Sequence, residues 1–179
     1  ATGSLGHGPG LAAGLALGAR LRGATHERVF CVMSDGELNE GSVWEAFAFA
    51  AHHKLSNLVF MIDKNDLQGF GRTSEVFNMA PLSDKLRSFG IVVHEADGHD
   101  FESLASCYAY ACDDARDLGA PSVILAKTVK GRGLVGLADT VDCHYLPMTT
   151  EVYEAAIQFC QSELDRALRL DREEDEHAS

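Results

Sequence analysis

Residues 29–68 read VFCVMSDGELNEGSVWEAFAFAAHHKLSNLVFMIDKNDLQ, and two apolar runs in and beside this stretch decide the fold. The first run, at 28–33, leads into Ser-Asp-Gly, and the second, at 57–63, leads into Lys-Asn. Each run is short, apolar on consecutive residues and separated from the next by helix-like sequence. This pattern is typical of parallel strands that are buried on both faces.

Two more runs of the same kind follow, GIVVHEA at 90–96 and PSVILAK at 121–127. Segments with helical character alternate with the runs, and we expect helices at 8–23, 41–55, 80–89, 100–118 and 151–170. The alternation predicts an α/β fold, with a parallel sheet flanked by helices and right-handed crossovers.

The sequence also predicts where one helix begins and which face of another is buried. Ser42 and Glu45 form an S-x-x-E capping box, which predicts a helix start near Val43 and a loop over 37–41. In the segment 100–118, apolar residues at helical spacing predict a buried stripe. Its members are Phe101, Leu104, Ala105, Tyr108 and Ala111 or Cys112.

Length and composition limit the classes of protein. A chain of 179 residues can bury a sizeable core, and we expect one domain over 1–170 followed by an acidic tail at 171–179. The formal net charge of −12 argues against a nucleic-acid partner. Five cysteines without a C-x-x-C pair predict reduced thiols in a cytoplasmic protein, and no run approaches the length of a membrane span. Because Ala1 stands directly before a glycine-rich motif, we expect further sequence upstream or in another chain.

Polar residues follow the first two runs. Because parallel strands end at the same edge of a sheet, Asp35 and Asn65 would face one crevice, where open α/β sheets bind ligands. A carboxylate and an amide oxygen suit Mg²⁺ better than Zn²⁺, and Mg²⁺ shares phosphate oxygens, so the pair predicts a phosphorylated cofactor. Gly36 would let the backbone approach that phosphate. The alternative is that Asp35-Gly36 is a simple turn and that Asn65 caps a loop.

Taken together, these residues resemble the thiamine diphosphate signature of the transketolase family. The resemblance covers nearly the whole chain and is closest to the N-terminal, diphosphate-binding subunit of a split transketolase. The motifs that carry it, in the family's order, are TGSLGHG at 2–8, SDGELNEGSVWEA at 34–46, KLSNLVFMIDKNDLQ at 54–68, ADGHD at 96–100, KTVKGRG at 127–133 and DCHYLP at 142–147. Ser34 departs from the pattern, because it stands where the family has the first glycine of G-D-G.

The resemblance implies a role for individual residues. Asp35, the side chain of Asn65 and the main-chain carbonyl of Leu67 would ligate Mg²⁺. The catalytic candidates are His144, Glu40 and Glu45, although a loop carboxylate and a helix-capping residue are equally good interpretations of the two glutamates. The residues implied in cofactor binding are Gly3, Ser4, Leu5, Asp35, Gly36, Glu37, Asn65 and His144.

The resemblance also implies an activity. The chain would bind thiamine diphosphate through Mg²⁺ and serve an enzyme that transfers a two-carbon ketol unit from a ketose, or ketose phosphate, to an aldehyde. It would be active only with a complementary subunit that carries the pyrimidine-binding domain and the catalytic glutamate, in a heterotetramer. The alternatives are another thiamine diphosphate carboligase or decarboxylating transferase in a specialised biosynthetic pathway, and a non-catalytic assembly subunit.

Overall fold

The computed structural model describes residues 3–24 and 26–177, without the side chains of 170–177. The chain divides into two compact units, Ala1–Thr128 and Val129–Ser179, and each is described by itself.

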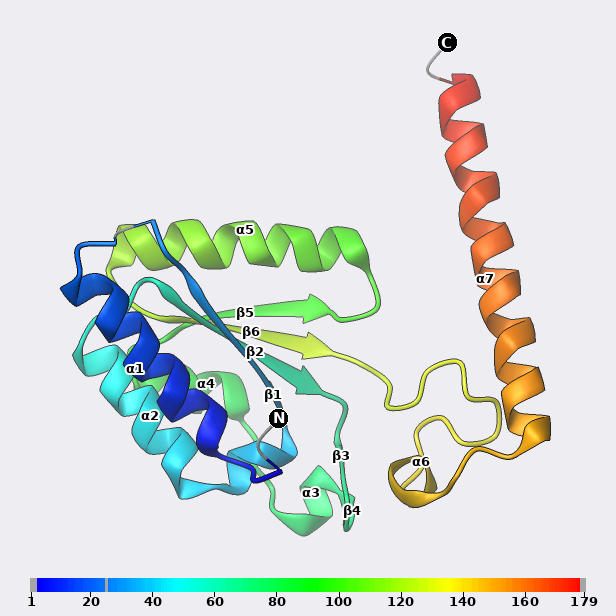
Figure 1. Ribbon diagram of the computed structural model, residues 1–179, viewed down its shortest axis with the longest axis horizontal. Coiled ribbons are helices and arrows are strands. Elements are labelled where there is room, and N and C mark those ends of the chain that lie inside the picture. Colours follow the sequence, from blue (N-terminus) through cyan, green and yellow to red (C-terminus); the bar gives the residue numbers. More distant parts are fainter. Residues whose placement is uncertain (1–2, 25, 178–179) are drawn as a thin grey trace. The chain divides into compact units, whose positions relative to one another are not determined.

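The first unit is built on a four-stranded sheet (Figure 1). Every neighbouring pair of strands is parallel, and the strand order is β1-β2-β6-β5. The strands are β1 (Val29–Ser34), β2 (Leu58–Lys64), β5 (Val92–Asp97) and β6 (Ser122–Lys127). The four apolar runs therefore form the predicted parallel sheet, and the α/β fold is confirmed.

Helices flank this sheet on both faces. Figure 1 shows α5 along one face, whereas α1, α2 and α4 lie on the other. A short 3-10 helix, η1, and a two-stranded hairpin, β3–β4, lie where the first two strands end. The bounds of these elements are α1 (His7–Leu21), η1 (Gly36–Asn39), α2 (Gly41–His52), β3 (Leu67–Gln68), β4 (Gly71–Arg72), α3 (Thr73–Val76), α4 (Leu82–Ser88) and α5 (Phe101–Leu118).

The hydrophobic core lies in two clusters, one on each face of the sheet. The larger cluster joins α1, α2 and α4 to the strands, and in it Phe47 packs edge-to-face on Phe60, with ring centroids 4.9 Å apart. The smaller cluster places Ala111 and Cys112 of α5 against Val59 of β2. Because successive strand residues point to opposite faces, Val59 and Phe60 belong to different clusters.

One helix start and one helix face differ from the sequence prediction. Helix α2 begins at Gly41 rather than near Val43, and Ser42 does not cap it, because its hydroxyl donates instead to the carbonyl of Gly6. In α5, three members of the predicted stripe are exposed: Phe101 at 88%, Tyr108 at 47%, and Ala105. Its other members, Leu104, Ala111 and Cys112, lie on the buried face as predicted. The buried face of that helix is formed by Leu104, Cys107, Ala111, Cys112 and Ala115.

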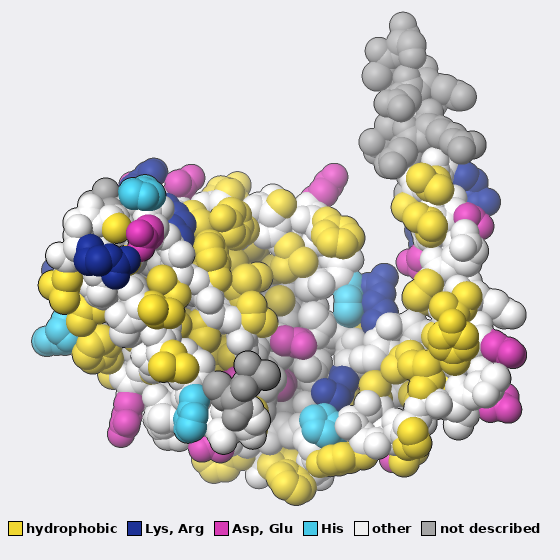
Figure 2. Space-filling view, in the orientation of Figure 1, with side chains coloured by type: hydrophobic (Ala, Val, Ile, Leu, Met, Phe, Trp, Pro, Cys, Tyr) yellow, Lys and Arg dark blue, Asp and Glu magenta, His cyan; other side chains and the backbone are white. Residues whose placement is uncertain are grey.

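The second unit contains a glycine-rich loop and two helices, α6 (Asp142–Tyr145) and α7 (Thr150–His177). The loop packs on α7: a Cβ added at Gly133 would lie 3.1 Å from the ring of Phe159, and Arg132 pairs with Glu163 at 3.8 Å. Helix α7 continues past Leu170, where the sequence predicted its end, into the acidic segment. Figure 2 shows hydrophobic side chains along α7.

Two global expectations concern cysteines and membranes. All five cysteines are free. Within residues 3–24 and 26–177, we find no helix that combines the length and the apolar character needed to cross a membrane.

Candidate functional site

Asp35 lies directly after β1 and is almost fully buried, with 2% of its surface exposed. Its carboxylate Oδ2 accepts hydrogen bonds from the backbone N–H of Asp66 at 2.7 Å and from Thr73 Oγ1 at 3.3 Å. The second oxygen, Oδ1, is buried and has no hydrogen-bond partner among the described residues. A buried acceptor without a partner is costly, so Oδ1 marks a position where a ligand would be favoured.

Burial also affects the pKa of this carboxyl group. Desolvation raises the pKa of Asp35, and the hydrogen bonds from Asp66 and Thr73 only partly oppose this rise. A cation beside Oδ1 would stabilise the charged form and offset the cost of burial.

Asn65 lies at the end of β2, in the chain segment that Asp35 contacts. It is 6% exposed, and its side-chain Oδ1 accepts a hydrogen bond from the N–H of Leu67 at 3.1 Å, which folds residues 65–67 into a tight turn. The bond from Asp66 N–H to Asp35 holds this turn against the end of β1. The structure therefore brings the segments of the three predicted metal ligands, Asp35, Asn65 and Leu67, together at the carboxyl edge of the sheet.

The chemistry of these donors suits a hard cation. One carboxylate, one amide and one backbone carbonyl are oxygen donors of the kind that Mg²⁺ accepts alongside phosphate oxygens. The described residues contain no group of three His, Cys, Asp or Glu side chains that could hold a metal. The donor set thus fits Mg²⁺ shared with a phosphorylated ligand better than a metal bound by protein side chains alone.

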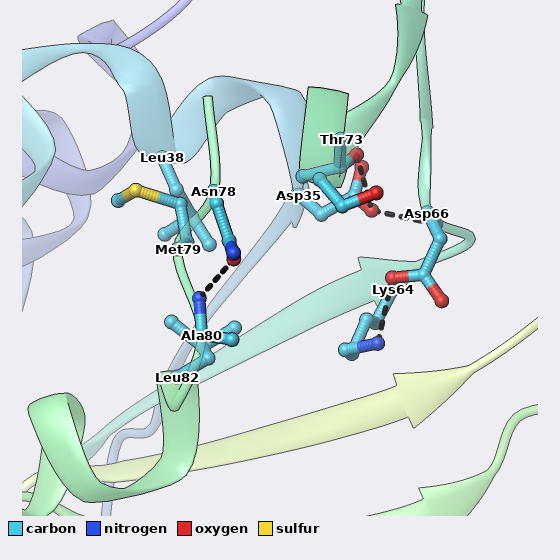
Figure 3. Close-up of a pocket in the computed structure, with 10 residues that line it drawn as sticks. Asp35, Leu38, Lys64, Asp66, Thr73, Asn78, Met79, Ala80 and Leu82 are labelled. Atoms are coloured by element: carbon cyan, nitrogen blue, oxygen red, sulfur yellow. Dashed lines mark hydrogen bonds and ion pairs between the residues drawn. The ribbon is translucent and has the colours of Figure 1, made fainter. Parts of the chain in front are cut away.

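A pocket opens beside Asp35 (Figure 3). Its walls are apolar where Leu38, Met79 and Leu82 line it. Charged groups stand at its other side, where Lys64 Nζ lies 2.7 Å from Asp66 Oδ1. The full lining is Asp35, Leu38, Lys64, Asp66, Thr73, Ser74, Asn78, Met79, Ala80 and Leu82.

Gly36 begins η1, where an added side chain would press on a residue of β3. A Cβ added at Gly36 would lie 3.2 Å from Cγ of Gln68, which is itself 9% exposed. Gln68 Oε1 accepts a hydrogen bond from Asn39 Nδ2 at 2.8 Å, so β3 is tied to η1. Gln68 Nε2 is buried without a partner among the described residues. The turn that carries Gly36 is thus held from the β3 side.

The N-terminal loop is held from the other side of the same turn. Gly3, Ser4 and Leu5 are exposed, and Gly6, which follows them, is buried. The N–H of Gly6 donates to Glu37 Oε1 at 2.9 Å. The loop and η1 are therefore connected directly.

The fold of the chain is shared with known proteins. Residues 1–163 match a family model described as transketolase, thiamine diphosphate binding domain. The chain belongs to the transketolase family. Its fold is that of solved transketolases: the enzyme from Campylobacter jejuni superposes with a TM-score of 0.79 at 28% identity, over 88% of this chain and 25% of that one.

Curated transketolase relatives are longer than this chain. A human transketolase-like protein 2 is 38% identical over 164 residues, which are 92% of this chain and 26% of the relative. One subunit of the apulose-4-phosphate transketolase from Actinobacillus succinogenes is 36% identical over 162 residues, 90% of this chain and 57% of the relative. The chain thus spans about a quarter of the first relative and somewhat more than half of the second.

The remaining predicted site residues are Glu40, Glu45 and His144, and neither glutamate lines the pocket of Asp35. Glu40 is exposed at the start of α2. Glu45 is exposed one turn later and lines a groove between α1 and α2 with Gly10, Gly14 and Phe49, among others. His144 lies in α6 of the second unit, where its ring contacts Tyr145. Their catalytic roles stay predictions.

Sequence reasoning did not single out Thr73, Asn39 or Gln68. Thr73 donates to Asp35 from 38 positions away, and no local pattern identifies it. Gln68 stands inside the third motif and Asn39 inside the second, but a motif does not say that their side chains meet.

Proposed function

We propose that this chain is the diphosphate-binding part of a thiamine-diphosphate-dependent transketolase that transfers a two-carbon ketol unit. The observation that carries the proposal is Asp35, whose buried Oδ1 has no partner among the described residues and lies beside the turn of Asn65. A buried carboxylate of this kind at the carboxyl edge of a parallel sheet is suited to a Mg²⁺ that also ligates a diphosphate.

In the proposed site, this chain binds and orients the cofactor. Asp35, the Asn65 side chain and the Leu67 carbonyl would hold Mg²⁺, and the backbone of Gly36 would lie beside the diphosphate. The loop of Gly3, Ser4 and Leu5 would line the cofactor with its backbone groups. When bound, thiamine diphosphate supplies the nucleophilic carbon and the electron sink that carbon–carbon bond cleavage in a ketose requires.

His144 would take part in proton transfer or polar contact near the substrate. An imidazole suits this work because its ordinary pKa lies near neutrality. Within the second unit, the side chain of His144 is exposed. A cytoplasmic location is part of the same proposal.

A complementary chain is expected to complete the site. The relative from Actinobacillus succinogenes is by its name one subunit of an enzyme, and this chain spans somewhat more than half of it. The first unit also leaves apolar surface open: Val32 of the edge strand β1 is 73% exposed, and Leu11 and Leu15 of α1 are 62% and 66% exposed. Parallel sheets are normally covered on both faces, so this surface supports a partner. In the proposal, that partner carries the pyrimidine-binding domain and a catalytic glutamate, and the two chains form a heterotetramer.

Two other functions remain alternatives. A different thiamine diphosphate carboligase or decarboxylating transferase would use the same metal edge and differ in substrate. A non-catalytic assembly subunit would use the carboxylate of Asp35 only as the acceptor for Asp66 and Thr73, and the burial of its charge destabilises the chain without a ligand. The intact donor set therefore favours catalysis.

Calorimetric titration of thiamine diphosphate in the presence of Mg²⁺ tests the proposal, with the chain alone and with a complementary pyrimidine-binding subunit. We expect binding that requires Mg²⁺ and is lost in Asp35→Asn. Asp97→Asn is the matched control, because Asp97 ends β5 at the same sheet edge and its carboxylate accepts a local bond from His99 N–H at 2.9 Å. Absence of binding with and without the subunit would overturn the proposal and favour the assembly role. If the cofactor binds, an assay for transfer of a two-carbon unit from ketose phosphates to aldehyde acceptors would distinguish a transketolase from the other carboligases.

A further inference from the structure

The peptide groups of Gly6 are held on both sides by residues that lie far from it in the sequence. Its N–H donates to Glu37 Oε1 at 2.9 Å, and its carbonyl accepts from Ser42 Oγ at 3.2 Å. These two bonds bridge 31 and 36 positions of the chain. One comes from η1 and the other from the first turn of α2, so Gly6 is clamped between two consecutive elements.

The clamp requires glycine at this position. Gly6 has φ = 84°, in the left-handed region that side chains disfavour. A Cβ there would lie 2.6 Å from Ser42 Oγ and 2.8 Å from Glu40 Cβ. The close approach of the backbone of Gly6 to α2 is therefore part of how the loop is held.

Glu37 connects the clamp to the turn that carries Gly36. It is the residue after Gly36 in η1, and its own N–H donates to Ser34 Oγ at 3.3 Å. Its carboxylate also lies near α1, because a Cβ added at Gly8 would be 3.9 Å from Glu37 Oε1. A shift of η1 would thus move Gly6 as well, because the hydrogen bond from Gly6 N–H to Glu37 Oε1 connects them.

We propose that Glu37 and Ser42 are positioning residues that hold Gly6 and thereby set the loop of Gly3, Ser4 and Leu5 against the diphosphate turn. This inference rests on the proposed function. In this arrangement Glu37 acts through Gly6 and not by contact with the cofactor. A carboxylate placed directly on a diphosphate would repel it, whereas a carboxylate on a backbone N–H forms a charge-assisted hydrogen bond.

The test compares Glu37→Ala, Glu37→Gln and Ser42→Ala in the full chain. Glutamine keeps an oxygen that can accept from Gly6 N–H, and alanine does not. Glu27→Ala is the matched control, because Glu27 is an exposed glutamate paired with Arg22 before β1. Two quantities are measured: amide hydrogen exchange at Gly6, without ligand, and the affinity for thiamine diphosphate with saturating Mg²⁺, with the complementary subunit present if the wild type requires it.

We expect Glu37→Ala to accelerate exchange at Gly6 and to weaken cofactor binding by about tenfold, the equivalent of one hydrogen bond. Ser42→Ala should weaken binding in the same direction, and Glu37→Gln and Glu27→Ala should resemble the wild type. Preserved folding is checked by the circular dichroism of each variant.

Several outcomes would overturn the inference. Unchanged Gly6 exchange in Glu37→Ala would show that the carboxylate does not hold the loop. Tighter cofactor binding in Glu37→Gln would show that the charge of Glu37 meets the diphosphate directly. If the wild type itself fails to bind, the proposed function falls, and the exchange measurement still decides whether Glu37 holds Gly6.

Discussion

The carboxylate of Asp35 accepts a hydrogen bond at 2.7 Å from the backbone N–H of Asp66, 31 positions later in the chain. This bond joins the ends of β1 and β2, which pair in parallel up to Ser34 and Asp63. One carboxylate oxygen therefore organises the turn of Asn65, while the other remains without a partner among the described residues. Asp35 is thus both a structural acceptor and the candidate metal ligand.

Replacement of Asp35 by asparagine should separate stability from ligand binding. Burial raises the pKa of Asp35, which means that the charged form is disfavoured in the folded chain. At neutral pH and without ligand, a neutral amide should therefore leave the fold at least as stable as the wild type, as often occurs at functional sites. Thermal melts of wild type and Asp35→Asn without Mg²⁺ measure this. A clearly lower melting temperature in the variant would contradict the prediction.

Cys31 should make stability depend on alkaline pH. Burial, reinforced by the nearby charge of Glu37, raises the pKa of the Cys31 thiol from 9.0 to about 11. Between these values the unfolded chain loses the proton and the folded chain retains it, so the free energy of unfolding should fall as pH rises through this window. Urea denaturation of wild type and Cys31→Ala at a series of pH values measures the free energy of unfolding of each. The part of its fall that Cys31 causes should be absent from the variant.

The same thiol should also react slowly. Cys31 is 7% exposed, whereas Cys160 is exposed on α7. Because the thiolate is the nucleophile, iodoacetamide below the raised pKa should label Cys160 well before Cys31. Peptide mapping after brief labelling checks the order, and equal rates would count against the burial of Cys31.

Gly36 and Gln68 should be energetically coupled. Gly36→Ala should destabilise the fold by about 1 kcal/mol, because its Cβ would press on Gln68 Cγ at 3.2 Å. In a Gln68→Ala background that contact is absent, so the same substitution should cost less. A double-mutant cycle on the free energy of unfolding measures the coupling, and strict additivity would contradict it.

Two phenylalanines, one buried and one exposed, should differ in how much their loss destabilises the chain. Phe47 is fully buried and packs on Phe60, so Phe47→Ala should destabilise the chain by about 3–5 kcal/mol. Phe101 is 88% exposed, so Phe101→Ala should change stability by less than about 0.5 kcal/mol. Chemical denaturation of both variants gives the comparison. A similar loss in the two would show that Phe101 is buried after all.

What the sequence determined by itself is the set of strands, their parallel arrangement and the edge at which the site lies. Short runs that are apolar on consecutive residues predict strands buried on both faces, and helices between them leave only parallel pairing. Because the carboxyl ends of neighbouring parallel strands coincide, the sequence alone places Asp35 and Asn65 at one edge. These conclusions depend on local patterns and on a general rule of topology.

Only the tertiary structure decided which distant groups meet. The S-x-x-E pattern at Ser42 indicates a local cap, but the hydroxyl of Ser42 donates to Gly6, 36 positions earlier. Helical spacing placed Phe101 in a buried stripe, but the face of α5 that meets the sheet is centred on Ala111 and Cys112. Local spacing describes which side chains share a face, whereas burial and hydrogen bonding depend on the element that packs against that face, and this is set by long-range contacts.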